Sequence, residues 1–235
     1  PFLLGEPMFA LGSAMAAWSP DGRKIAFHAD IAGNWDLYTL DLHSGKVEAL
    51  TNSEDDEVLL AWSPDGQRAA YTNGPDGQTY IFVMDANGAN QQQLTGLDAL
   101  IVTPSETVLE IVPPLMATAT ALVPPSSVPS GNPNTNFIQH WHPDWSADGQ
   151  RIVFASQEGS FVEELYVIDV ATGQIERLTD NGYAEQNPVW LPDGRLMFTS
   201  DREVIRSIWV MNADGREATR LTPRNLEADA AVWRP

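Results

Sequence analysis

The residues best suited to chemistry are acids and histidines that stand at one recurring position. Five residues before the tryptophans at 18, 62, 145, 190 and 233, the chain has Ser13, Glu57, His140, Glu185 and Ala228. Neighbouring positions add more polar groups, namely Asp56, His142, Gln186, Asn187, Glu227 and Asp229. Carboxylates and imidazoles bind divalent metal ions, and acids also attract basic partners. This position therefore suggests a site for a cation, a ligand or a partner.

Two of these residues, His140 and His142, are separated by a single residue. On an extended strand they would point to the same face, so both imidazoles could bind one metal ion. Together with Glu57 and Glu185 they form a candidate ligand set for a divalent first-row metal. Nothing in the sequence requires a cofactor, and a divalent metal at these residues is the only cofactor for which it offers candidate ligands. A His-x-His pair is a weak motif, and a solvated acidic face in an acidic protein is the plainer interpretation.

A repeated sequence unit must position these residues. Trp-Ser-Pro-Asp-Gly stands at 18–22 and 62–66, and edited copies stand at 145–149 and 190–194. The spacing is 44 residues from Trp18 to Trp62, 45 from Trp145 to Trp190, and 43 from Trp190 to Trp233. A fixed period of this length is typical of repeat architectures.

Each copy continues in the same way. The Ser-Pro-Asp-Gly segment has the residues of a tight turn, and an apolar triplet with β character follows it. A second apolar run, a glycine turn and a polar strand come next. The polar strand ends in Leu-Thr in all four copies, at Leu50-Thr51, Leu94-Thr95, Leu178-Thr179 and Leu221-Thr222. Each unit therefore contains four short strands.

A lone four-stranded sheet of this kind is apolar on both faces and must bury them. Radial stacking of such sheets achieves this, which predicts an all-β fold, a β-propeller with four-stranded antiparallel blades. We expect the tryptophans to pack between blades. Loops that lead into the innermost strands should surround one end of the central channel, and this rim would carry Asp56, Glu57, His140, His142, Glu185, Gln186, Glu227 and Asp229.

The repeat predicts a single propeller domain over 1–235, with clear blades at 18–51, 62–95, 145–179 and 190–222. Between Thr95 and Trp145 the chain is longer than elsewhere by nearly one repeat. A degenerate blade over 102–135, with Val102 in the place of the tryptophan, is the preferred interpretation, and a long projecting insertion is the alternative. Residues 1–17 and 223–235 would form a partial sixth, closing blade. Two strands of that blade have no candidate, so the chain is expected to be part of a longer protein.

The motif series Trp-Ser-Pro-Asp-Gly, Ile-Ala-Phe, Asp-Leu-Tyr, Leu-Asp, Ser-Gly and Leu-Thr resembles the WD-like repeat of TolB-type periplasmic proteins. The resemblance covers 18–95 and 145–235. Propeller domains of prolyl-oligopeptidase-like enzymes have the same repeat. The resemblance implies a propeller and a periplasmic or extracellular location, but no particular activity.

Composition excludes several function classes. The chain has 32 acidic and 13 basic residues, and its formal net charge is −19. Nucleic acids and anionic membranes both need a basic surface, so neither is an expected partner. Without cysteine there can be no disulfide or thiolate metal site. The sequence has no Gly-x-Ser-x-Gly, no His-Glu-x-x-His and no apolar stretch long enough to cross a bilayer.

We therefore expect a non-catalytic domain that binds a protein or peptide, or acts as a structural scaffold, through its channel face; a purely architectural role in a larger assembly is a further option. Two alternatives stay open. The first is the substrate-gating propeller of a prolyl-oligopeptidase-like peptidase. The second is a metal-dependent carbohydrate-active lyase centred on His140 and His142, because some lyases of related propeller build use channel histidines with a metal.

Overall fold

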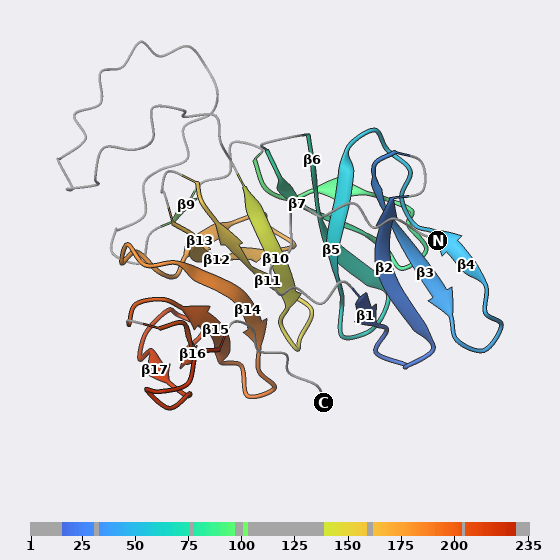
Figure 1. The fold of residues 1–235 in the computed structure, drawn as a ribbon. Helices are drawn as coiled ribbons and strands as arrows, with labels where there is room; N and C mark the ends of the chain where they lie inside the picture. Colours follow the sequence, from blue (N-terminus) through green and yellow to red (C-terminus); the bar gives the residue numbers. More distant parts are fainter. Residues whose placement is uncertain are drawn as a thin grey trace, which may run out of the picture.

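The computed structural model describes residues 16–30, 33–75, 78–96, 101–102, 139–158, 162–203 and 205–228. In these ranges every regular element is a β-strand, and the strands form four sheets in chain order, which follow one another along an arc (Figure 1). The all-β propeller fold predicted from the repeat is confirmed. Within the described part of the chain, no helix is long and apolar enough to cross a bilayer.

The four sheets have the following strands. The first contains β1 (Ala16–Trp18), β2 (Lys24–Asp30), β3 (Trp35–Asp41) and β4 (Val47–Ala49). The second contains β5 (Asp56–Trp62), β6 (Arg68–Gly74), β7 (Tyr80–Asp85) and β8 (Gln92–Gln93). The third contains β10 (His140–Trp145), β11 (Arg151–Ser156), β12 (Glu164–Asp169), β13 (Ile175–Arg177) and β9 (Ile101–Val102). The fourth contains β14 (Glu185–Trp190), β15 (Leu196–Ser200), β16 (Ser207–Met211) and β17 (Thr219–Arg220).

The Ser-Pro-Asp-Gly segment forms the first hairpin turn of a sheet through its own side chains. Ser19 Oγ donates a hydrogen bond of 2.6 Å to the Asp21 carboxylate and accepts one of 2.9 Å from the Lys24 N–H. The corresponding serines of the second and third sheets make the same two bonds. The serine and the aspartate recur because the turn requires them.

The threonine of each Leu-Thr ending fastens the outer strand to the strand beside it. Its Oγ1 accepts a backbone N–H from the third strand of the sheet at 2.8–3.2 Å, in the pairs Thr51 with Leu37, Thr95 with Ile81, Thr179 with Leu165 and Thr222 with Ile208. Because three of these bonds are buried, the hydroxyl satisfies a donor that water cannot reach. This explains why the dipeptide recurs.

Thr179→Val is expected to lower the free energy of unfolding by about 1–3 kcal/mol, the usual cost of leaving a buried donor without an acceptor. Valine keeps the shape of threonine, and the change removes the acceptor of the Leu165 N–H. Urea denaturation measures the loss. The control is Thr219→Val at an exposed position of β17, for which a change within about 0.5 kcal/mol is expected. Equal midpoints for the two variants would contradict this role.

Successive sheets meet at three junctions, which we call the first (first and second sheets), second (second and third) and third (third and fourth). A tryptophan of the innermost strand lies at each one, and Trp62, Trp145 and Trp190 are 9 %, 4 % and 6 % exposed. At the second junction, Trp145 Nε1 donates to the Ala61 carbonyl at 3.2 Å, and the Arg68 guanidinium lies 4.7 Å from the ring centroid. Trp18 precedes the first junction and is 53 % exposed.

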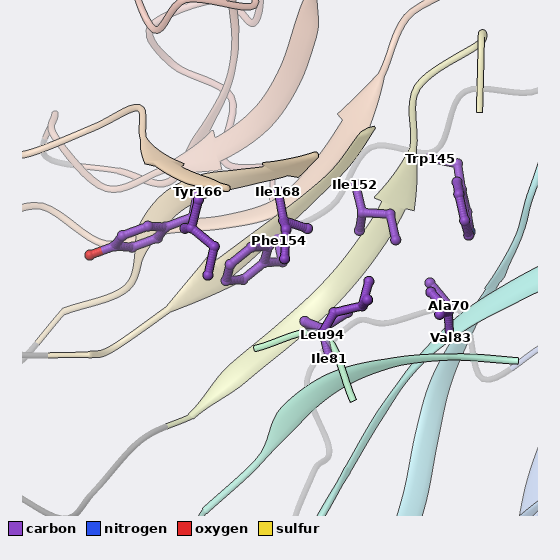
Figure 2. Close-up of a cluster of buried hydrophobic side chains, with 10 residues drawn as sticks. Ala70, Ile81, Val83, Leu94, Trp145, Ile152, Phe154, Tyr166 and Ile168 are labelled. Carbon is purple, nitrogen blue, oxygen red and sulfur yellow. The ribbon is translucent and has the colours of Figure 1, made fainter. Parts of the chain in front are cut away.

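The core at the second junction is drawn from both sheets. Figure 2 shows Trp145, Ile152 and Phe154 of the third sheet facing Ala70, Ile81 and Val83 of the second. Burial of these faces between sheets is the stabilising contact that a propeller requires. The predicted packing of tryptophans between blades is confirmed at all three junctions.

The second and third sheets are direct neighbours, since β10 contacts β5, β6 and β7. Val102 lies in β9, which pairs in parallel with β13 at the outer edge of the third sheet. It therefore does not take the innermost place of a tryptophan, as the sequence suggested. Residues 103–138, as well as 1–15 and 229–235 of the expected closing blade, lie outside the described residues.

Candidate functional site

The recurring position five residues before the tryptophan lies at the beginning of the innermost strands. Glu57 is the second residue of β5, and His140 and Glu185 begin β10 and β14. We call this end of the sheets the channel face. The three side chains are 0 %, 1 % and 0 % exposed. Sequence reasoning placed them on a surface rim, but side chains this deeply buried cannot touch a partner directly.

Glu57 instead supports the loop that leads into β5. Its Oε1 accepts hydrogen bonds from Ser53 Oγ and, at 3.0 Å, from Asn73 Nδ2. The same loop is held from the first sheet, where Asn34 Nδ2 donates to the carbonyls of Ser53 and Asp55 at 3.0 and 2.9 Å. A buried carboxylate thus fixes the path of residues 52–55.

Glu185 supports the corresponding loop before β14. Asn181 Nδ2 donates to both of its oxygens, at 2.9 and 3.1 Å, and Arg202 Nη2 donates to Oε1. The adjacent Glu164 accepts the backbone N–H groups of Asn181 and Gly182 at 3.1 and 3.3 Å. Residues 180–184 are therefore held by buried acids, as residues 52–55 are.

The two buried glutamates each meet a second acid across a junction. Burial raises the pKa of Glu57 above its ordinary value, although hydrogen bonds from Ser53 and Thr51 act in the opposite direction, and contact with Asp36 of the first sheet raises it further. Burial likewise raises the pKa of Glu164, and its contact with Glu185 of the fourth sheet adds to the effect. Two neighbouring carboxyls resist simultaneous ionisation because like charges repel.

At the second junction, His140 takes the place of the acid and forms part of an aromatic stack. Its ring centroid lies 6.1 Å from that of Tyr80 and 5.2 Å from that of Phe154. Burial lowers the pKa of His140 to about 4, so the ring is neutral at pH 7. Glu158 lies beside it, with its Oε2 3.8 Å from Nε2. The position of His140 is that of a packing residue.

His142 lies in a β-bulge, which changes the geometry assumed for the two histidines. Its φ is +54°, and the register of β10 against β11 shifts between Trp141 and Asp144. Side chains no longer alternate regularly across such a bulge, so the same-face argument fails. Where the structure describes the chain, no group of three or more His, Asp or Glu side chains could hold a metal ion. The expected ligand set of His140, His142, Glu57 and Glu185 is therefore not assembled.

The remaining rim residues have varied positions. Asp56 is partly buried and accepts the Trp35 N–H at 2.9 Å. Gln186 and His142 are also partly buried, whereas Glu227 is exposed. Asp229 lies outside the described residues.

The exposed groups at the channel face belong to the loops themselves, and sequence reasoning missed them. They are Glu54, Asp180, Tyr183 and Asp201. Asp201 also accepts the Ala184 N–H at 2.8 Å, which ties a third loop to the residues before β14. For Glu54, Asp180 and Tyr183, the signal in the sequence was their position between a Leu-Thr ending and the next strand.

Asp144 is another residue that sequence reasoning missed. It follows the bulge in β10, and its Oδ2 accepts the Trp190 N–H across the third junction at 2.7 Å. Burial raises the pKa of Asp144 to about 7, although hydrogen bonds from the backbone act in the opposite direction. This carboxyl therefore changes its charge near neutral pH.

Asp144→Asn is expected to remove part of the loss of stability that occurs as pH rises. Between the unfolded pKa near 3.9 and the folded pKa of about 7, the folded wild type binds more protons than the unfolded chain, so its stability falls with pH. Asparagine can still accept the Trp190 N–H and cannot ionise. The difference in melting temperature, variant minus wild type, should therefore increase from pH 5 to pH 8. A constant difference over this range would show that Asp144 does not titrate there.

Antiparallel four-stranded sheets, packed face to face through tryptophans of their innermost strands, define a β-propeller. The family model described as "TolB beta propeller domain" (PD40) matches residues 9–109 and 133–235 of this chain. The chain belongs to this family.

Relatives of several kinds carry similar sequences. The uncharacterized peptidase YuxL of Bacillus subtilis is 27 % identical over 108 residues, which are 43 % of this chain and 16 % of YuxL. The Tol-Pal system protein TolB of Francisella tularensis is 30 % identical over 83 residues, which are 34 % of this chain and 19 % of that protein. The chain thus matches less than a fifth of the length of either relative.

Among solved structures, TolB from Acinetobacter baumannii superposes with a TM-score of 0.62 and 18 % identity. The match covers 91 % of this chain and 44 % of that one. At this level of identity the likeness shows the fold alone.

Proposed function

We propose that this propeller is a non-catalytic binding domain whose channel face takes a protein or peptide partner. The observation that carries the proposal is the common support of two loops, at 52–55 and 180–184, by the buried acids Glu57 and Glu185. Loops fixed in this way lose little conformational entropy on binding, which favours recognition.

The chemistry of the loops indicates the kind of partner. Glu54 and Asp180 are exposed acids, and Tyr183 adds a ring that is 46 % exposed. Tyrosine is common at the energetic centre of interfaces, and charge complementarity selects among partners. With a net charge of −19, the chain should prefer a basic polypeptide segment.

Membership of the family extends the proposal to the setting of the protein. A relative named as a Tol-Pal system protein supports a role in a larger assembly, in the periplasm or outside the cell.

A peptide array tests the proposal. Lysine- and arginine-rich peptides should bind more tightly than acidic peptides of equal length, and binding should weaken at high salt. Asp180→Lys and Tyr183→Ala should each reduce binding about tenfold, a loss of the size expected for interface residues. The control Glu48→Lys makes the same charge change at an exposed residue of β4. Equal binding by all of these proteins would contradict the proposal.

A second candidate is the propeller of a peptidase, which the likeness to YuxL favours. In that case the channel face would admit peptides to a hydrolase domain. The whole product of the gene would then cleave short peptides and react with a serine-directed fluorophosphonate. A product that binds basic peptides and does neither would support the first proposal.

A further inference from the structure

The acid pairs at the first and third junctions occupy equivalent positions but differ in their neutralising charges. At the third junction, Arg177 Nη2 lies 3.3 Å from Glu164 Oε1, and Arg202 donates to Glu185. Two guanidinium groups thus face two carboxyls. Both arginines are largely buried, so screening by water is weak and the compensation is effective.

The first junction has no such cations. Arg177 precedes the Leu-Thr ending of its sheet, and Ala49 takes that place in the first sheet. Arg202 follows Phe198 by four residues, and Pro75 takes that place after Tyr71 in the second sheet. In the described residues, no salt bridge reaches Asp36 or Glu57.

The other titratable groups around this pair are neutral or acidic. The charge of Asp36 acts on Tyr38 of β3, and that of Glu57 acts on Tyr71 of β6. Asp56 lies next to Glu57 on β5. On β2, His28 is kept neutral by burial, which lowers its pKa. None of these groups supplies a positive charge at neutral pH.

One oxygen of each carboxyl in this pair lacks a donor. Asp36 is 2 % exposed and Glu57 is 0 % exposed. Neither Asp36 Oδ1 nor Glu57 Oε2 receives a hydrogen bond from another group in the described part of the chain. Since the two carboxyls touch, a single proton between them would satisfy both oxygens and remove one of the two buried charges.

We propose that Asp36 and Glu57 share one proton at neutral pH, which makes the first junction a pH-sensitive contact between two blades. At the third junction two arginines lie against the equivalent pair, so we expect the loss of a proton there to destabilise the contact less. When the shared proton leaves, two buried carboxylates repel each other. Glu57 then holds the loop at 52–55 less firmly in place. This inference concerns the stability of the fold and does not depend on the proposed partner.

The direction of the effect follows from linkage. The folded state keeps a proton that the unfolded chain releases above about pH 4, the ordinary range of Asp and Glu. Between that value and the raised folded pKa of Glu57, the folded state binds more protons, so stability falls as pH rises.

Glu57→Gln is the decisive variant, because its amide is a permanent equivalent of the protonated acid. Its oxygen can accept from Ser53 and Asn73, and its N–H₂ group can donate to Asp36. Melting temperatures from pH 5 to pH 9 should be nearly equal to those of the wild type at pH 5 and higher by about 3–6 °C at pH 9. Asp36→Asn should behave in the same way and serves as the second variant if Glu57→Gln does not fold.

The matched control is Glu185→Gln at the third junction. It removes the charge that Arg202 binds, so its melting temperature should be lower than that of the wild type at every pH, without a gain at high pH. If Glu57→Gln melts lower than the wild type by a constant amount across the range, proton sharing is wrong.

A bound cation is the other species that could neutralise the pair. Calcium chloride at pH 9 would then raise the melting temperature of the wild type and not that of Glu57→Gln, and this outcome would overturn the proposal. If calcium has no selective effect on the wild type and Glu57→Gln gains at high pH, the shared proton is supported.

Discussion

Trp145→Ala is expected to lower the free energy of unfolding by about 3–5 kcal/mol, as truncation of a large buried aromatic residue usually does. Trp145 is 4 % exposed and belongs to the core between the second and third sheets. The change would open a cavity in that core, remove the hydrogen bond to the Ala61 carbonyl and deprive the Arg68 guanidinium of its aromatic partner. All three losses act at the second junction, so the contact between the second and third sheets would be weakened.

The matched control is Trp18→Ala, which alters the same residue of the repeat at a position that is 53 % exposed. Its cost should stay below about 1 kcal/mol, because little apolar surface returns to water. Guanidinium denaturation of the two variants measures the difference. Similar losses would show that the recurring tryptophan stabilises its own hairpin and not the contact between sheets.

A double-mutant cycle separates the stacking of Arg68 from the remaining contacts. Arg68→Ala and Trp145→Ala should be coupled by about 0.5–2 kcal/mol, the range for a cation over a partly desolvated ring. Arg151 over Trp190 has the same 4.7 Å geometry at the third junction and should give a similar coupling.

The repeat made the fold predictable because each of its signals acts locally. Ser19 and Asp21 form the turn within a few residues, and Thr179 reaches a strand of its own sheet. Tryptophan spacing then indicates which residues meet between sheets. Such contacts depend on residue type and short spacing, which a single sequence displays directly.

The exposure of the channel-face residues was not predictable in this way. Position five before the tryptophan does lie at the end of the sheets, but loops fold back over it. Ser53 and Asn181 turn toward Glu57 and Glu185 and bury them. Whether an acid at a loop end meets solvent or supports the loop depends on the path of that loop, which residue type does not reveal.

The two histidines show a different limit. The bulge gives φ values of +58°, +54° and +50° at Leu59, His142 and Asn187, which occupy equivalent places in three strands. Histidine and asparagine are enriched in this conformation, whereas leucine is not. The bulge therefore left no common signature in the sequence, and the regular alternation assumed for His140 and His142 did not hold.

The segment before β10 illustrates the limit of counting. An excess close to one repeat length fits a degenerate blade as well as an insertion. Only the contacts of β10 with β5, β6 and β7 show which sheets are neighbours. The pairing of β9 with β13 then places the beginning of this segment at the outer edge of the third sheet.

Arg202→Leu should make the third junction more like the first, because it removes one of the two arginines that face the acid pair. Arg202 donates to Glu185 and lies 4.6 Å from the centroid of the Trp209 ring. Removing one partner of a buried ion pair leaves an uncompensated charge, so we expect a loss of about 3–5 kcal/mol at pH 8. At pH 5 the loss should be smaller, because Glu164 and Glu185 can then share a proton as Asp36 and Glu57 are proposed to do.

The sign of this pH dependence distinguishes electrostatics from packing. The stacking of Arg202 on Trp209 contributes equally at both pH values, so only the ionic part of the loss should shrink in acid. Arg202→Lys should recover part of the stability at pH 8, since it restores the charge without the planar fork. Arg195→Leu removes an exposed arginine from the same sheet and should change stability by less than about 0.5 kcal/mol. If Arg202→Leu loses the same stability at pH 5 and pH 8, Arg202 contributes packing on Trp209 and does not neutralise the acid pair. The electrostatic difference between the first and third junctions would then have no physical basis.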